Sequence, residues 1–349
     1  MTTTDELRPA TTDGPRLITP SRNGPGPTNR SAPLVPSHGL GSGRVGFDLP
    51  GLLVGTAEYA DGPTGATVLH FPRGARTAVD ERGGAVGLIG GYPFNDALCF
   101  AGGSVYGLAA ATGVAEELLE RDGGRVAFDR LKTVSGAIIY DFSVRDNAIH
   151  PDGALGAAAL RAARADSVTV GRAGAGAGAS AGKVDWSRTE HTGQGAAFRQ
   201  AGDVKVFVLT VVNPVGVVVD RDGRVVRGNY DALAGERRHP EADFSRAFHE
   251  RGRPAIAAGN TTVTAVVTNV ALGDAALAQF ARQVHSSMHR AIQPFHTAMD
   301  GDVLFAATTD EVVLPTDPSS RFGALSITPT AVGAIASEAA WDAVLSAAR

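Results

Sequence analysis

The sequence has very little cysteine and very little lysine. Its 349 residues include one cysteine, Cys99, so an internal disulfide and a thiolate metal cluster are both excluded. We expect Cys99 to behave as a small buried apolar residue. Three of the 32 basic residues are lysines, at positions 132, 183 and 205. Because arginine is the usual cation of this chain, each lysine is a candidate for a specific role.

An excess of positive charge and a long apolar run are also missing. The formal net charge is −4, which provides no basic surface for a phosphate backbone and disfavours nucleic-acid binding. The longest apolar run, 206–219, is interrupted by Thr210, Asn213 and Pro214, and a membrane-spanning helix needs about 20 apolar residues. The first residues show no secretory signal pattern. Together with the single cysteine, this favours a cytoplasmic protein.

The composition is that of a folded protein. Apolar residues make up 43% and charged residues 19% of the chain, enough for a sizeable core. Residues 1–44 differ, because they contain seven of the 19 prolines and few regularly spaced apolar residues. We therefore predict a flexible N-terminal arm over 1–44 and a single folded domain over 45–349.

From residue 45 onward, short apolar strands alternate with helical patterns. Strands are predicted at 51–59, 66–71, 85–89, 134–140, 261–270 and 303–308, and a long hairpin at 204–226 that turns at 220–223. Helices are predicted in the second half of 101–120, at 155–165, at 274–292, and after an N-cap at Thr328. Strands and helices mix without strict alternation and without an internal repeat, which predicts an α+β layered sandwich.

A glycine-rich tract contains two motifs of weak specificity. Residues 178–182 match the G-x-S-x-G pattern of hydrolases with Ser180 as nucleophile, but that motif requires a strand before it and a helix after it, and neither pattern is present. The pair Gly182-Lys183 is similar to the end of a phosphate-binding loop, but Ala177 and Val184 stand where that motif needs Gly and Ser or Thr. We interpret the tract as a packing loop and predict no nucleotide cofactor.

Two histidines four residues apart raise the question of a metal. His285 and His289 have the spacing of a zinc-binding helix, but Ser286 stands where a hydrolytic site of that kind has Glu. Both flank an apolar stripe, so we interpret them as half-exposed structural histidines. The sequence therefore predicts no metal site.

The start of the strand predicted at 261–270 contains a candidate nucleophile. Gly259 and Asn260 end a turn-prone segment, and Thr261 begins a β-branched run. A threonine hydroxyl is a weak nucleophile unless a base lies beside it. If the chain were cut before Thr261, its new α-amine would supply that base, with a pKa near working pH. An ordinary turn into a strand is the alternative.

This stretch, Ala258–Asn269, resembles the self-processing junction of the N-terminal-nucleophile amidases, the family that contains the β-peptidyl and D-aminopeptidases. The chain is most similar to its nylon-oligomer hydrolase branch, the 6-aminohexanoate-oligomer endohydrolases. The likeness covers about residues 45–349 and includes further stretches in the same order: Gly62–Thr67, Arg76–Asp80, Ile139–Phe142, Ala179–Trp186, Asn213–Gly216, Gln283–His289, Met299–Asp302 and Ala334–Glu338.

The resemblance implies a four-layer αββα sandwich of the type shared with ornithine acetyltransferases. It also implies an internal cut between Asn260 and Thr261, which leaves a large chain of 45–260 (with the arm) and a small chain of 261–349. The processed protomers of such enzymes assemble, so a homotetramer is expected.

The resemblance assigns roles to individual residues. Thr261 matches the nucleophile, and Thr rather than Ser favours the nylon-hydrolase branch. Lys183 matches an active-site lysine that could lower the pKa of the Thr261 amine or stabilise an oxyanion. Asn213 matches the oxyanion residue, whose side-chain amide is a suitable donor. Tyr140 matches a tyrosine that lines the same pocket and could add a hydroxyl contact to the substrate.

Two acidic residues complete the expected site. Asp300 and Asp302 match the carboxylates beside the nucleophile, and an Asp pair again favours the nylon-hydrolase branch. On an extended segment, residues two apart point the same way, so we expect both to face Thr261 and orient its amine and hydroxyl. Without the resemblance, Asp300-Gly-Asp302 could equally be a turn with solvated charges.

The expected activity is hydrolysis of internal amide bonds in linear aliphatic polyamides through an acyl-enzyme. A β- or D-aminopeptidase on the same scaffold, an acyltransferase of the ornithine-acetyltransferase type, and a non-catalytic sandwich that binds a partner are the alternatives. The amidase needs no cofactor.

Overall fold

The computed structural model describes residues 14–250, 252, 259–315 and 327–349. The helices are α1 (Ala109–Arg121), α2 (Gly153–Arg161), α3 (Pro240–His249), α4 (Asp274–Ser287) and α5 (Ile327–Ala347). The strands are β1 (Gly43–Gly46), β2 (Leu53–Tyr59), β3 (Thr64–Glu81), β4 (Leu88–Ile89), β5 (Phe94–Ala101), β6 (Val134–Ile138), β7 (Ser167–Val170), β8 (Ser180–Ala181), β9 (Glu190–His191), β10 (Gln194–Ala201), β11 (Val204–Asn213), β12 (Val217–Val219), β13 (Val225–Arg227), β14 (Tyr230–Asp231), β15 (Glu236–Arg237), β16 (Thr261–Val270), β17 (Ile292–Gln293) and β18 (Val303–Val312).

One nine-stranded sheet organises the molecule. Its longest strand, β3, takes part in both halves of the sheet, the half with β2 and β5 and the half with β18. The strand order is β10-β11-β16-β18-β3-β5-β6-β4, with β2 also paired to β3. The first part of β3 pairs with β2 and β5, its second part pairs with β18, and the register shifts between His70 and Ala75. Such an irregularity bends a strand, so the two halves of the sheet can face each other.

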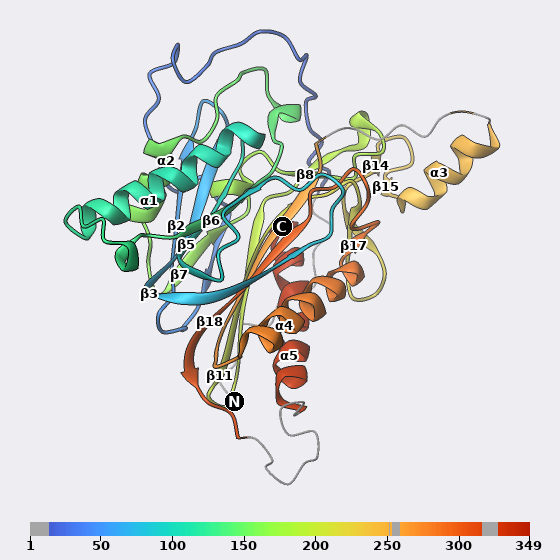
Figure 1. The fold of residues 1–349 in the computed structure, drawn as a ribbon. Coiled ribbons are helices and arrows are strands. Elements are labelled where there is room, and N and C mark those ends of the chain that lie inside the picture. The colour runs from blue at the N-terminus through green and yellow to red at the C-terminus, as the bar shows by residue number, and fades with distance from the viewer. Residues whose placement is uncertain (1–13, 251, 253–258, 316–326) are drawn as a thin grey trace.

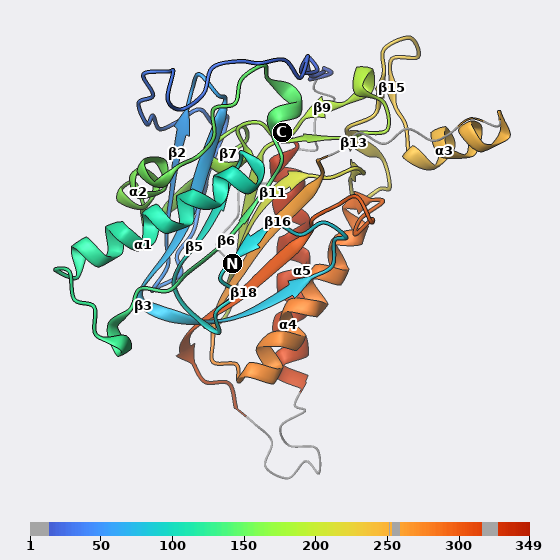
Figure 2. The ribbon, with the colours of Figure 1, turned by 45° about the horizontal axis from the view of Figure 1, so that its top comes forward.

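The two halves enclose a central apolar layer and are covered by helices on the outside. Side chains from both halves form one buried cluster between them, in which the rings of Phe100 and Phe305 lie 5.9 Å apart. On the outer face of one half lie α1 and α2, and on the outer face of the other lie α4 and α5 (Figures 1 and 2). The predicted four-layer αββα sandwich is therefore confirmed.

The strands in the middle of the sheet are buried on both faces. In β16, Val263, Ala265 and Val267 face the central layer, whereas Val266 and Val270 pack in the cluster formed with α4 and α5. A strand with two buried faces has a continuous apolar pattern rather than an alternating one. This explains why residues 261–270 are so strongly β-branched.

Most of the predicted elements are present, with shifted ends. The strands predicted at 51–59, 66–71, 134–140, 261–270 and 303–308 correspond to β2, β3, β6, β16 and β18, and the predicted helices correspond to α1, α2, α4 and α5. Thr328 lies inside α5, so its prediction as the N-cap was wrong. Cys99 is a free, buried residue, as expected.

Two predicted elements were wrong in their extent. The predicted turn at 220–223 is present and joins β12 to β13 in an antiparallel pair, but the hairpin is short. It does not extend back to residue 204, because β11 pairs with β10 and β16, whereas β12 belongs to a separate small sheet with β13 and β17. Pro214 cannot donate a ladder hydrogen bond and follows the last residue of β11, which separates the two strands. The strand predicted at 85–89 is reduced to β4.

The predicted arm is described from residue 14 onward. This part runs as extended chain over the domain and makes isolated bridges at Leu17 with Glu190 and at Ser37 with Glu58. Residues 1–13 lie outside the described residues, and the boundary at 44 stays a prediction. No described helix is long and apolar enough to cross a membrane.

The central layer provides a test of the fold. Replacing Phe305 with Ala leaves a cavity between the two halves of the sheet, and we expect a loss of about 3–5 kcal/mol in the free energy of unfolding. Phe128→Ala is the control, because that ring is 91% exposed and its loss should change stability by less than about 0.5 kcal/mol. Urea denaturation of the single-chain Thr261→Ala protein measures both. Equal losses of stability in the two variants would contradict the packing of Phe305 between the two halves of the sheet.

Candidate active site

The candidate nucleophile begins a strand whose neighbours bring the other predicted residues to it. Thr261 is the first residue of β16, and in the antiparallel pairing with β11 it lies opposite Asn213. On its other side β16 runs parallel to β18, so the segment that precedes β18, Asp300–Asp302, lies beside the start of β16. A bridge between Asn260 and Asp300 continues the same register three residues before the first pair of the two strands, Val263 and Val303.

Thr261 is in contact with the peptide bond that is expected to be cut. Its side-chain hydroxyl donates a hydrogen bond to the carbonyl oxygen of Asn260. The same oxygen accepts a hydrogen bond from the backbone N–H of Gly301 at 2.9 Å. A Cβ atom at position 301 would lie 2.8 Å from the Thr261 hydroxyl oxygen and 2.6 Å from the Ala85 carbonyl oxygen, so glycine is needed for this close approach.

Lys183 and Asn213 form a buried pair next to the junction. Lys183 Nζ donates to the backbone oxygen of Asn213 and to its side-chain Oδ1, both at 2.8 Å, and to the carbonyl oxygen of Gly259 at 3.4 Å. Asn213 Nδ2 donates to the carbonyl oxygens of Gly259 and Tyr140, both at 3.2 Å. The pair therefore holds the carbonyl of Gly259, one residue before the carbonyl that Thr261 contacts.

Burial dominates the electrostatics of Lys183. It is fully buried, and this lowers its pKa to about 7, although the charges of Asp300 and Asp302 act in the opposite direction. An ammonium has three N–H donors, and the three oxygens around Nζ match that number. The side chain is thus held in one position while its proton is weakly bound.

The carboxylates of Asp300 and Asp302 accept hydrogen bonds from different segments. Asp302 Oδ1 accepts from the backbone N–H of Thr262 at 2.6 Å, which fixes the start of β16. Asp300 instead accepts from the backbone N–H groups of Val215 and Thr297, both at 3.1 Å. In the intact chain the hydrogen bonds of both carboxylates that the structure describes go to residues other than Thr261, so the expectation that both orient its amine and hydroxyl stays a prediction. Burial raises the pKa of both carboxyls, that of Asp302 to about 6.

His296 holds Asp302 and was not predicted from the sequence. Its backbone N–H and its ring Nδ1 lie 3.0 and 3.1 Å from Asp302 Oδ2. Burial lowers the pKa of His296 to about 4, so the ring is neutral near pH 7 and Nδ1–H is the donor to the carboxylate. The backbone of His296 has φ 58°, a conformation uncommon among residues with a side chain, which His adopts more readily than most.

Tyr140 contributes its ring and its backbone to the site. A Cβ atom at Gly259 would lie 2.2 Å from the Tyr140 ring, and Gly259 has φ 88°, so the junction passes directly over the ring. Its backbone carbonyl positions Asn213. In the described part of the chain its hydroxyl makes no hydrogen bond, and the expected contact of this hydroxyl with a substrate stays a prediction. Ala258, the first residue of the junction motif, lies outside the described residues.

The serine motif and the histidine pair, both of weak specificity, lie as follows in the fold. Ser180 lies in the two-residue strand β8, with no helix after it, and its backbone N–H donates to Asn213 Oδ1 at 3.1 Å. His285 is fully buried and bonded to Asp80 at 2.9 Å, so the expectation that it is half-exposed was wrong, whereas His289 is exposed. Among the described residues, no three metal-binding side chains are grouped to hold an ion.

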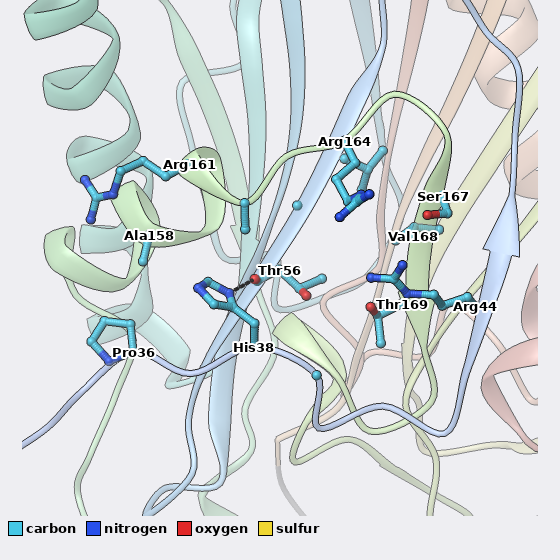
Figure 3. Close-up of a pocket in the computed structure, with 14 residues that line it drawn as sticks. Pro36, His38, Arg44, Thr56, Ala158, Arg161, Arg164, Ser167, Val168 and Thr169 are labelled. Atoms are coloured by element: carbon cyan, nitrogen blue, oxygen red, sulfur yellow. Dashed lines mark hydrogen bonds between the residues drawn. The ribbon is translucent and has the colours of Figure 1, made fainter.

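A separate cavity lies away from this constellation. It has a volume of about 610 Å³ and lies between residues 36–39, β2, β7 and the end of α2 (Figure 3). Arg44, Arg161 and Arg164 are part of its lining, but none of the predicted site residues is. The candidate active site is therefore the buried cluster at the start of β16.

The proton of Lys183 provides a test of the site's electrostatics. Between pH 7 and the ordinary lysine pKa of 10.5, the unfolded chain holds a proton that the folded chain has released. The free energy of unfolding should therefore rise with pH, by about 1.4 kcal/mol per pH unit from this group.

Lys183→Met removes that contribution while keeping an apolar side chain of similar length. Urea denaturation at pH 7, 8 and 9, with and without this change in the Thr261→Ala chain, measures the difference in slope. The same slope in both proteins would mean that Lys183 keeps its proton above pH 9.

Comparison with known proteins finds relatives that cover most of the chain. Over 335 residues the chain is 60% identical to a 6-aminohexanoate-oligomer endohydrolase of Paenarthrobacter ureafaciens, with 96% of this chain and 94% of that protein covered. An uncharacterized aminopeptidase of Mycobacterium tuberculosis is 38% identical over 300 residues, which cover 80% of this chain and 84% of that one.

Solved structures show the same fold at low sequence identity. A Burkholderia sp. β-aminopeptidase matches with a TM-score of 0.59 and 18% identity, covering 89% of this chain and 88% of that one. An L-aminopeptidase D-Ala-esterase/amidase from Ochrobactrum anthropi matches with a TM-score of 0.61 and 15% identity, covering 86% and 84%. The model of peptidase family S58 matches residues 47–349. The chain is therefore a member of peptidase family S58.

Proposed function

We propose that this protein is a self-processing N-terminal-threonine amidohydrolase. It would cut its own chain between Asn260 and Thr261 and then hydrolyse internal amide bonds of linear aliphatic polyamides, such as 6-aminohexanoate oligomers, through an acyl-enzyme. The observation that carries the proposal is the contact of the Thr261 hydroxyl with the carbonyl of Asn260. The 60% identity to 6-aminohexanoate-oligomer endohydrolases supports the substrate class.

The self-cleavage would begin with attack of Thr261 Oγ on the carbonyl carbon of Asn260. The hydroxyl proton passes to the Thr261 nitrogen as the peptide bond breaks, and an ester forms between Asn260 and Thr261. Charge that develops on the Asn260 oxygen is stabilised by the N–H of Gly301. Water then hydrolyses the ester, which leaves a carboxylate on Asn260 and a free α-amine on Thr261.

In the processed enzyme, the same threonine would attack a substrate amide. Its α-amine takes the hydroxyl proton, and Asp302 orients the start of β16 through Thr262. The N–H of Gly301 would again meet the oxyanion. Lys183 and Asn213 hold the Gly259 carbonyl in the intact chain, and departure of that segment would free their N–H groups to add to the stabilisation of the substrate oxyanion. A donor of this kind is worth about 3 kcal/mol. As the substrate C–N bond breaks, the leaving amine takes the proton that the α-amine received, and an ester forms between the acyl group and Thr261. Water then hydrolyses this ester and frees the acid and Thr261.

An aminopeptidase is the second candidate, because a 38% identical relative is named as one. An aminopeptidase requires a free amine at the substrate end, whereas an endohydrolase does not. Incubation with an oligomer of 6-aminohexanoate that carries a blocked amine distinguishes them. Internal fragments in the product mixture indicate an endohydrolase, and an uncut oligomer indicates an aminopeptidase.

We propose further that the processed protomers form a homotetramer in the cytoplasm. The family resemblance supports this assembly, and the sequence pattern supports the location. Light scattering of the purified protein on a sizing column measures the assembly, and a monomer mass would contradict it.

The nucleophile can be tested by the mass of the purified protein. Under denaturing conditions we expect two species of about 27 and 9 kDa, in proportion to 260 and 89 residues of a 35.8 kDa chain. The smaller one should begin at Thr261. Thr261→Ala should give one species of full length, because no hydroxyl can attack Asn260. Thr262→Ala is the matched control and should still be cut, and two fragments from Thr261→Ala would refute the assignment.

The carboxylate Asp302 makes self-cleavage depend on pH. Its oxygens accept three hydrogen bonds, which require the ionised form, so the cleavage rate should fall as pH drops through its pKa of about 6. His296→Ala removes the ring donor, and we expect cleavage about tenfold slower and a midpoint at higher pH. His296→Asn should come closer to the parent, because Asn tolerates positive φ and keeps a donor.

Chains made by cell-free translation and transferred to buffers of different pH allow the cleavage rate to be followed on a denaturing gel. His70→Asn is the control, since His70 is also half-buried and its ring Nδ1 lies 3.1 Å from a backbone carbonyl, that of Asp96. A parental rate and midpoint in His296→Ala would show that His296 does not act through Asp302.

A further inference from the structure

A row of aromatic side chains leads from the junction to the protein surface. Tyr140, whose ring packs against Gly259, lies with its ring centre 5.6 Å from that of Phe142. Phe142 in turn lies 6.3 Å from the ring of Tyr106, again in an edge-to-face arrangement. Tyr140 and Phe142 are half-buried and Tyr106 is 62% exposed, so the row becomes open to solvent at its outer end.

A buried ion pair holds this row in place. The carboxylate of Asp141 accepts from Arg145 at 2.7 Å and from the backbone N–H of Gly103 at 2.9 Å. The first contact fixes the segment of Phe142, and the guanidinium of Arg145 lies 4.2 Å from the centre of the Phe142 ring. The second fixes the chain just before Tyr106. The row is thus set before any ligand arrives, which reduces the entropy lost on binding.

The junction indicates which side of a substrate would meet the row. Gly259 lies on the acyl side of the bond between Asn260 and Thr261, and its backbone passes over the Tyr140 ring. A substrate attacked by Thr261 must place its own acyl side in the same direction from the nucleophile. Beyond the reacting carbonyl, its chain would therefore reach Tyr140 first and the other two rings after it.

We infer that Tyr140, Phe142 and Tyr106 form a subsite for the acyl-side methylene chain of a linear aliphatic amide. This inference rests on the proposed function and adds a specificity determinant to it. The chemistry fits, because an unbranched chain of methylene groups offers apolar surface and no charge, and an aromatic wall offers the same. Charged or strongly branched acyl groups would gain nothing from this wall.

The experiment uses two matched series of amides and the purified, processed enzyme. In the first series 6-aminohexanoate is acylated with acetyl, hexanoyl or decanoyl groups, so that only the acyl side grows. In the second series hexanoyl amides are made with ω-amino acids of increasing length, so that only the amine side grows. Release of the amine gives kcat/KM for each compound.

For the acyl series we expect kcat/KM to rise about twofold for each methylene that reaches the wall, compared with about fourfold for a fully buried methylene. Tyr106→Ser should reduce the rise between hexanoyl and decanoyl, and Phe142→Ala should reduce it between acetyl and hexanoyl as well. Tyr106→Phe should restore the parental dependence, because the ring and not the hydroxyl forms the wall. Phe128→Ser, a change at another exposed ring, should leave both series unchanged.

The outcomes separate the inference from the proposed function. If the protein neither cuts itself nor hydrolyses any of the amides, the proposed function fails. If it hydrolyses them but Tyr106→Ser keeps the parental acyl dependence, the subsite is refuted and the proposed function stands. A change in the amine series instead of the acyl series would also refute it. Tyr106 is exposed, so its replacement tests the idea even if Phe142→Ala does not fold.

Discussion

The parallel pairing of β16 with β18 is the constraint on which the site depends. Parallel neighbours begin at the same edge of a sheet, so the residue that starts β16 and the residues that precede β18 must lie together. Thr261 thereby meets Gly301, and Thr262 meets Asp302, although 40 residues separate the members of each pair in the sequence. The antiparallel neighbour β11 ends at the same edge and adds Asn213. Both faces of these strands are buried in apolar layers, so the edge is held rigidly.

Because this edge is dry, every polar group in it needs a partner, and the partners are mostly backbone groups. The carboxylate of Asp302 is satisfied by N–H groups of Thr262 and His296, and the ammonium of Lys183 by carbonyl and amide oxygens. The cost of burying charge remains visible in the pKa of Lys183, lowered to about 7, and of Asp302, raised to about 6. Groups that exchange protons near neutrality are suited to acid–base chemistry.

The sequence predicted the layers and the identity of the clustered residues better than their orientation. The β-branched run at 261–270 and the apolar stripe of 274–292 depend on local periodicity, which a sequence displays directly. The hydrogen bonds of Asp300 depend on loops from elsewhere in the chain. The hairpin expected at 204–226 kept its turn but not its length, because apolar composition does not reveal which strand is the partner of β11. His296 carried no sequence signal except its place six residues before Asp302. The need for glycine at 301 becomes visible only when Thr261 and Ala85 are brought beside it.

Under the proposed function, the intact chain and a substrate must both place an amide against Thr261, and this links the proposed precursor to the processed enzyme. In both cases an amide carbonyl must lie against the Thr261 hydroxyl with its acyl side pointing away from β16. The segment before Thr261 solves the problem by occupying the donors of Lys183 and Asn213 with the Gly259 carbonyl and by crossing the Tyr140 ring. Only a residue without a side chain can pass over the Tyr140 ring, because a Cβ atom at position 259 would clash with it. A methylene chain has the same slim profile as this glycine backbone, and a branched side chain does not. Under the proposed function, the shape that allows the chain to approach Thr261 would therefore also select unbranched acyl groups.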